Sequence, residues 1–213
     1  MLLKIKRIKE NLISNSEIIS ELEQKCDIEN IDKINWNEYP YKPDVKFNIA
    51  VNSDSIFILY KVIEDGIRAT ETEFNSNVWE DSCCEFFCSF DETGYYNLEV
   101  NCIGTPLLGF RKQKDLPEHA SDEIMQNIKT YSTLGSKPFG TKEGKHEYKL
   151  LVTIPAKVFF KHEINLKKSL SFKTNIYKCG DKTPNMHFLS WSPISTDTPN
   201  FHCPEFFSKA ILE

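Results

Sequence analysis

The stretch VWEDSCCEFFCSFDETGYYNLEVNCIG, from Val78 to Gly104, contains two strand-like runs on either side of a turn. Side chains of a β-strand alternate between the two faces of a sheet, so every second residue shares a face. One such set in each run is apolar: Cys84, Phe86, Cys88 and Phe90 in the first, and Tyr96, Leu98, Val100 and Cys102 in the second. The stretch therefore predicts an antiparallel hairpin with these two sets facing a hydrophobic core.

The opposite face of this hairpin mixes polar and aromatic side chains. It carries Cys83, Glu85, Phe87, Tyr95, Asn97, Glu99 and Asn101. Polar alternation usually marks a solvated outer face. However, two carboxylates on adjacent strands repel each other, and lysine is missing from this face to offset them. Phe87 among the polar groups, and Trp79 just before the strand, also allow a binding site, and both interpretations remain open at this point.

The length of the turn decides which residues face each other. A four-residue loop would place core residues opposite outward ones. A three-residue loop, 92–94, avoids this mismatch and ends on a glycine in the left-handed position that such loops favour. In this register we expect Glu85 opposite Asn101, and Phe87 opposite Glu99.

Strand-like runs recur along the rest of the 213 residues. VKFNIAV and SIFILYKVI flank a short turn, and IKTYSTL, HEYKLLVTI, SLSFKTNIYK and FFSKAILE follow. Ser14 and Glu17 have the spacing of a capping box for a short helix, and residues 111–124 are expected to form a polar loop with a helical turn. Many short strands without strand–helix alternation predict an all-β fold, a single antiparallel β-sandwich of immunoglobulin-like or jelly-roll type with a few short helices over residues 1–213.

Charge and composition exclude several partners. The net charge is −5 and only three arginines occur, whereas nucleic-acid binders usually need a basic face. No apolar run of about 18 residues is present, so no membrane span is expected. The start of the chain lacks the uninterrupted apolar segment of a signal peptide. The seven cysteines form no even framework, which favours free thiols and a cytoplasmic location.

The two neighbouring cysteines raise the question of a metal site. Cys83 and Cys84 must point to opposite faces of one strand, and Cys84 and Cys88 lie about 13 Å apart along it. Thiolates on one zinc ion must lie within a few ångströms of each other. Cys179 could approach only through the fold, and nothing in its spacing supports this. We therefore expect no metal ligands among these residues.

Two motifs together resemble a known family. VWEDSCCEFF followed by GYYNLEVN is similar to the sugar-binding segment of carbohydrate-binding module family 9. The later stretch FKTNIYKCGDKTPNMHFLSWSPISTDTPNFHCPEFFSKAIL resembles the end of the stand-alone bacterial domains of that family. The resemblance extends from about Trp36 to the end of the sequence and implies a β-sandwich that binds carbohydrate.

The resemblance also implies roles for particular residues. Trp79 matches the first sugar-stacking aromatic, and Phe201 matches the second, which is a tryptophan in modules attached to xylanases. Glu85 matches the glutamate that accepts hydrogen bonds from sugar hydroxyls, and Asn101 matches a strand asparagine of the site. Glu99 stands where the xylanase-attached modules have an arginine, which places binding to polymer ends in question.

These matches imply a non-catalytic domain that recognises a mono- or oligosaccharide or a glycan end, alongside glycoside hydrolases in polysaccharide breakdown. Structural calcium is associated with the family, but the acidic loops of this chain do not reveal its ligands. Two alternatives stay open. One is a glycoside hydrolase that uses Glu85 and Glu99 as its carboxylate pair, and the other is a β-sandwich that binds proteins through its aromatic residues. The oligomeric state does not follow from the sequence.

Overall fold

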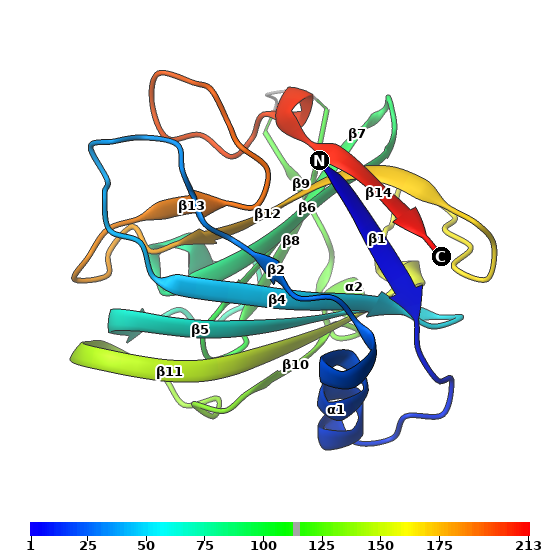
Figure 1. The fold of residues 1–213 in the computed structure, drawn as a ribbon, viewed down its shortest axis with the longest axis horizontal. Helices are drawn as coiled ribbons and strands as arrows, with labels where there is room; N and C mark the ends of the chain where they lie inside the picture. The colour runs from blue at the N-terminus through cyan, green and yellow to red at the C-terminus, as the bar shows by residue number, and fades with distance from the viewer. Residues whose placement is uncertain (113–115) are drawn as a thin grey trace.

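The computed structural model describes residues 1–112 and 116–213, and its strands form two stacked layers (Figure 1). The lower layer contains β10 (Lys129–Ser132), β11 (Phe139–Pro155), β5 (Ser55–Ala69) and β4 (Asp44–Val51), with β2 (Glu29–Asn30) paired to β4. The upper layer contains β14 (Ser208–Leu212), β12 (Ser171–Cys179), β6 (Cys83–Asp91), β7 (Gly94–Asn101), β8 (Pro106–Arg111) and β9 (Glu118–His119), with β13 (Phe188–Ser190) and β3 (Lys33–Ile34) beside β12. The β-sandwich is therefore confirmed.

Strand β1 (Leu2–Arg7) joins the two layers. Its first residues pair with β14, and its last two, Lys6 and Arg7, pair with β4. Both pairings are parallel, which departs from the purely antiparallel arrangement that we expected. One strand can pair with both layers because each layer forms hydrogen bonds with a different end of the strand.

The main core lies between the layers and contains the apolar faces predicted for the hairpin. Cys84, Phe86 and Cys88 on β6 are each at most 1% exposed, and Leu98 and Val100 on β7 are each 2% exposed. They pack with side chains of β4, β5 and β11 in one cluster. The period-two pattern thus identified the core face correctly.

The register predicted for this hairpin is wrong by two residues. Glu85 faces Glu99, Phe87 faces Asn97 and Cys83 faces Asn101. The pairing shifts between Cys88 and Asp91, where an irregularity absorbs a residue next to the turn. A shift of two keeps every side chain on its face but changes each cross-strand neighbour, so the two carboxylates are directly opposite rather than diagonal.

The second face of the upper sheet is not solvated, contrary to one of the two interpretations. Phe87, which the sequence suggested as an exposed aromatic, is fully buried, and Asn97 is 1% exposed. A second apolar cluster covers this face and includes Trp36, Tyr177, Phe201 and Phe207. Segments far away in the sequence supply this cover, so local alternation could not reveal it.

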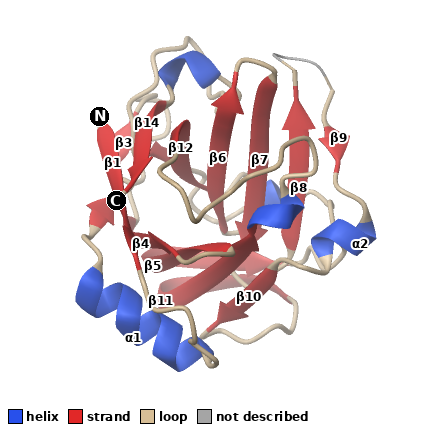
Figure 2. Cartoon of the chain, turned by 90° about the vertical axis from the view of Figure 1, so that its right-hand side faces the viewer, coloured by secondary structure: helices blue, strands red, loops and turns tan. Residues whose placement is uncertain are grey.

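Helices lie at the margins of the sandwich. Helix α1 (Asn15–Lys25) begins at the predicted capping box and packs against the outer face of the lower layer (Figure 2). Of the polar loop expected over 111–124, positions 113–115 lie outside the described residues, and the rest contains β9 and the short helix α2 (Asp122–Met125). Single 3₁₀ turns also occur in the described part of the chain: η1 (Val78–Glu80), η2 (Ala156–Val158) and η3 (Pro204–Phe206). No helix within the described residues is both long and apolar enough to cross a membrane.

A buried ion pair connects the two layers. The Lys178 ammonium on β12 lies 3.0 Å from the Glu64 carboxylate on β5, and both side chains are fully buried. Lys178 also donates to the Nε2 of His187 at 2.9 Å, and the Tyr148 hydroxyl donates to Glu64 at 2.8 Å. These partners satisfy charges that the apolar interior would otherwise penalise.

We expect Lys178→Met to lower the free energy of unfolding by about 3–5 kcal/mol, because it leaves the Glu64 carboxylate buried without its cation. The control is Lys182→Met, which removes a lysine that is 59% exposed in its pair with Glu80 and should change the free energy by about 0–1 kcal/mol. Urea unfolding of the two variants measures the difference. Equal losses would contradict the importance of the buried pair.

Candidate functional site

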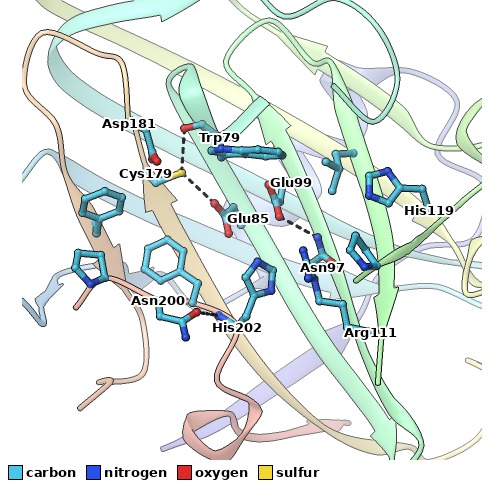
Figure 3. Close-up of a pocket in the computed structure, with 15 residues that line it drawn as sticks. Trp79, Glu85, Asn97, Glu99, Arg111, His119, Cys179, Asp181, Asn200 and His202 are labelled. Carbon is cyan, nitrogen blue, oxygen red and sulfur yellow. Dashed lines mark hydrogen bonds between the residues drawn. The ribbon is translucent and has the colours of Figure 1, made fainter. Parts of the chain in front are cut away.

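A pocket of about 410 Å³ opens on the second face of the upper sheet. Its lining comes from strands β6, β7, β8, β9 and β13, the end of β12, the turn η1 and neighbouring loops (Figure 3). The lining residues are Trp79, Glu85, Asn97, Glu99, Leu107, Arg111, Pro117, His119, Cys179, Asp181, Phe188, Pro199, Asn200, Phe201 and His202. Four of the five residues predicted for the site are among them: Trp79, Glu85, Glu99 and Phe201.

Two facing carboxylates form the floor of the pocket. Glu85 is 3% exposed and Glu99 is 4% exposed, and residues directly opposite on antiparallel strands have Cβ atoms about 4.5–5.5 Å apart. The Asn97 amide donates to Glu99 at 2.9 Å, and the Cys179 thiol donates to Glu85 at 3.0 Å. Both carboxylates therefore have a donor from the protein and further lone pairs for a ligand.

Burial shifts the protonation of both groups. It raises the pKa of Glu99 to about 7, against the opposing effects of the Asn97 hydrogen bond and the Arg111 charge. It raises the pKa of Glu85 well above its usual range, and the neighbouring Glu99 charge adds to the rise. Burial also raises the pKa of Asp181, at the rim, to about 6. The floor is thus a set of carboxyl groups that can accept or donate hydrogen bonds near neutral pH.

Trp79 and His202 lie on opposite sides of this floor. In Figure 3 the indole lies above the carboxylates of Glu85 and Glu99, and the imidazole of His202 lies below them. Arg111 lies beside Asn97 at the far end. The half-buried indole thus forms one wall, and the imidazole forms the other.

A buried network holds the turn that carries Trp79. Asp81, fully buried just after η1, accepts hydrogen bonds from the backbone N–H groups of Thr70 and Glu71 and pairs with Arg68. The backbone carbonyl of Trp79 also accepts from the N–H of Asp181 at 3.2 Å. The indole therefore projects from a turn that is fixed on two sides.

The structure does not bring Asn101 into the pocket. Its amide donates to the Asp81 carboxylate and to the Glu71 carbonyl, each at 2.9 Å, and its Oδ1 accepts from the N–H of Thr105 at 2.8 Å. With its side chain fully buried and these bonds made, Asn101 stabilises the turn beneath Trp79. Ligand contact by Asn101, which the resemblance implied, has no support in this geometry.

Phe201 lines the pocket but is only 9% exposed. Its ring stacks on Tyr177 with centroids 4.1 Å apart and planes 6° apart. Because Tyr177 covers one face of the Phe201 ring, a ligand can contact only the other face or the edge of that ring. His202 also lines the pocket, and its Nδ1 shares a hydrogen bond with the Tyr95 hydroxyl at 3.2 Å.

Other lining residues were missed in the sequence. Leu107 and Arg111 on β8 face Glu99 and Tyr95 on β7, so the same alternation continues into a strand that we had not predicted. Asn97 approaches the backbone of Gly109 so closely that a Cβ there would lie 2.7 Å from its Oδ1. The alternation of the PLLGFR segment could have revealed the strand β8 from the sequence. Asp181 and Cys179, in contrast, reach the pocket only because β12 pairs with β6.

Comparisons with known proteins identify the family. Residues 17–212 match the family described as Carbohydrate-binding family 9. The chain belongs to carbohydrate-binding family 9. A crystal structure of a candidate carbohydrate-binding protein from Bacteroides uniformis is 37% identical, covers 100% of this chain and 99% of its own, and superposes with a TM-score of 0.95. No curated protein matches significantly.

More distant structures share the fold of this family 9 domain. A family 9 module from Caldicellulosiruptor kristjanssonii in complex with glucose has a TM-score of 0.64 at 9% identity, covering 100% of this chain and 96% of that one. The same description applies to a complex with cellotriose, at a TM-score of 0.61, 11% identity and coverage of 100% and 94%. At sequence identities this low, the two structures support a shared fold and nothing further.

One cluster of metal-ligand side chains borders the pocket, and its composition does not suit calcium. Among the described residues, the cluster of metal-ligand side chains consists of Cys83, Glu85 and Cys179. Calcium takes six to eight oxygen ligands, whereas two of these three groups are thiols. The spacing of the cysteines gave no reason to place Cys179 near Cys83, but the two residues lie directly opposite each other on neighbouring strands.

The wall formed by His202 should make the domain sensitive to acid. Burial, together with the Arg111 charge, lowers the pKa of His202 to about 4. Between pH 6.5 and 4 the unfolded chain binds a proton here that the folded domain does not, so stability falls as the pH falls through this window. A shift of this size corresponds to roughly 2–4 kcal/mol.

We therefore expect His202→Gln to reduce the loss of stability between pH 7.5 and pH 4 by roughly 2–4 kcal/mol relative to the unmodified domain. Urea unfolding at both pH values measures this difference. His146→Gln, on β11 and away from the pocket, is the control and should leave the loss unchanged. A His202→Gln variant as acid-sensitive as the unmodified domain would contradict this assignment.

Proposed function

We propose that this family 9 domain binds a mono- or oligosaccharide, or the end of a glycan, without catalysing its cleavage. The observation that carries the proposal is the half-buried indole of Trp79 above the facing carboxylates Glu85 and Glu99. A pyranose ring presents apolar C–H faces and a rim of hydroxyls, and this arrangement offers an aromatic face for the first and acceptors for the second. The likeness to carbohydrate-binding proteins supports the same reading.

Stacking and hydrogen bonding would share the recognition. An aromatic face adds about 0.5–1.5 kcal/mol beyond the burial of area. Hydrogen bonds between the hydroxyls and the carboxyl groups of Glu85 and Glu99, together with the donors of Asn97 and Arg111, select the orientation of the hydroxyls. The pocket volume of about 410 Å³ lies at the small end of ligand pockets, which span about 300–1,000 Å³ and so suit one or two sugar rings here.

The arrangement of the carboxylates disfavours a hydrolase. A glycosidase needs two carboxyl groups that flank the scissile bond. Here Glu85 and Glu99 stand next to each other on one sheet floor and would approach a ring from the same side. A protein-binding role is also less favoured, because Trp79 faces into a pocket lined by buried polar groups. Action alongside glycoside hydrolases stays a prediction.

Calorimetric titration with a panel that includes glucose, cellotriose, xylose and galactose tests the proposal. We expect at least one saccharide to bind with a Kd between about 1 μM and 1 mM, which corresponds to about −8 to −4 kcal/mol. Incubation with oligosaccharides should release no new reducing ends. Cleavage that Glu85→Gln abolishes would replace the proposal by the hydrolase, and the absence of binding across a broad glycan array would overturn it.

Trp79→Ala should weaken binding of that saccharide at least tenfold, because the ring loses its stacking partner. Glu85→Gln should weaken it to a similar degree, because an amide N–H₂ donor replaces one of the two carboxyl oxygen acceptors. Tyr131→Ala, which removes an exposed aromatic on β10, is the matched control and should bind as the unmodified domain does. A Trp79→Ala variant with full affinity would contradict the placement of the ligand.

A further inference from the structure

Two thiols and a carboxylate meet at the end of the pocket floor. Cys83 on β6 and Cys179 on β12 are directly opposite in the antiparallel register, and Glu85 follows Cys83 on the same face. One ligand atom from each of the three lies within 4.8 Å of the other two. The closest approach is 3.0 Å, between the Cys179 sulfur and an oxygen of Glu85.

These distances suit a small thiophilic cation. Zinc binds sulfur at about 2.3 Å and carboxylate oxygen at about 2.0–2.2 Å, so tetrahedral ligands lie about 3.3–3.8 Å apart. The ligand atoms of Cys83, Glu85 and Cys179, each within 4.8 Å of the other two, lie near this spacing. Thiolates prefer zinc and related soft metals, whereas calcium and magnesium prefer oxygen ligands.

The position of the cluster leaves one side open. Glu85 and Cys179 line the pocket, and Cys83 lies fully buried behind them. A cation held by these three groups would have its fourth position directed at the pocket, as in open zinc sites that bind water or a ligand oxygen. It would also offset the repulsion between Glu85 and the facing carboxylate of Glu99.

We propose that Cys83, Glu85 and Cys179 form a binding site for a thiophilic divalent cation, of which zinc is the type. Binding forms two metal–sulfur bonds and one metal–oxygen bond, and the S–H protons of Cys83 and Cys179, with any proton on the Glu85 carboxyl, pass to solvent. Burial raises the pKa of the Cys83 thiol to about 12, so the metal itself must drive this deprotonation. The site shares Glu85 with the proposed saccharide site, but the metal proposal does not rest on saccharide binding.

Cadmium is a suitable probe, because its thiolate complexes absorb in the ultraviolet. The protein is stripped with EDTA, desalted, kept reduced with a phosphine and titrated with cadmium. We expect thiolate–cadmium absorption that saturates at one equivalent. Zinc affinity then follows from competition with a chromophoric chelator. An unmodified, folded protein that shows neither absorption nor zinc uptake overturns the proposal.

Variants assign the ligands. Cys179→Ser and Cys83→Ser should each lower zinc affinity at least tenfold and weaken the absorption, and Glu85→Gln should lower affinity while the absorption persists. Cys88→Ser, a fully buried cysteine on the other face of β6, is the control and should bind metal as the unmodified protein does. Thermal unfolding confirms that each variant folds. Equal losses in Cys88→Ser and Cys179→Ser would overturn the site.

Sugar titrations of the stripped protein keep the two proposals distinguishable. Saccharide binding without metal leaves the proposed function in place whatever the cadmium result. Metal binding at Cys83 and Cys179 in a protein that binds no sugar supports the metal site and counts against the proposed function alone.

Discussion

Glu85 and Glu99 face each other across two neighbouring strands whose sheet is buried on both sides. Placing two carboxylates side by side in such surroundings is unfavourable, because burial disfavours the charged form and like charges repel. Each carboxyl group accepts one hydrogen bond from the protein, Glu85 from the Cys179 thiol and Glu99 from the Asn97 amide. Burial also raises both pKa values, so that a carboxyl can keep its proton and avoid the charge. The pocket and its proposed ligands depend on this arrangement.

The sandwich supplies the rigid support that such a floor requires. One face of β6 and β7 packs into the main core, so the backbone beneath the carboxylates cannot shift without disturbing that core. The loops and the C-terminal segment then cover the other face with aromatic rings, leaving the pocket uncovered. Trp79 stands at its edge on a turn that Asp81 and Asn101 hold from below. Stability and recognition thus use different faces of one sheet.

Much of the hairpin could be predicted, because strand alternation is strict. The faces of Cys84, Phe86, Leu98 and Val100 were correct even though the register was wrong by two, since an even shift preserves them. The shift in strand register depends on an irregularity next to the turn. The residue types there permit this irregularity but do not require it. Asn101 was assigned to the site by resemblance, and only the contacts of its amide reveal its different role.

The sequence alone determined the β-sandwich, the side of the β6–β7 hairpin that faces the main core, and the family, because these rest on local alternation and on motifs within short segments. The tertiary structure decided which polar groups meet. The packing of distant strands and loops brings Cys179 beside Glu85. It also places His202 across the pocket floor from Trp79. Alternation has a period of two and fixes the face of a residue, whereas its neighbours on that face depend on long-range pairing.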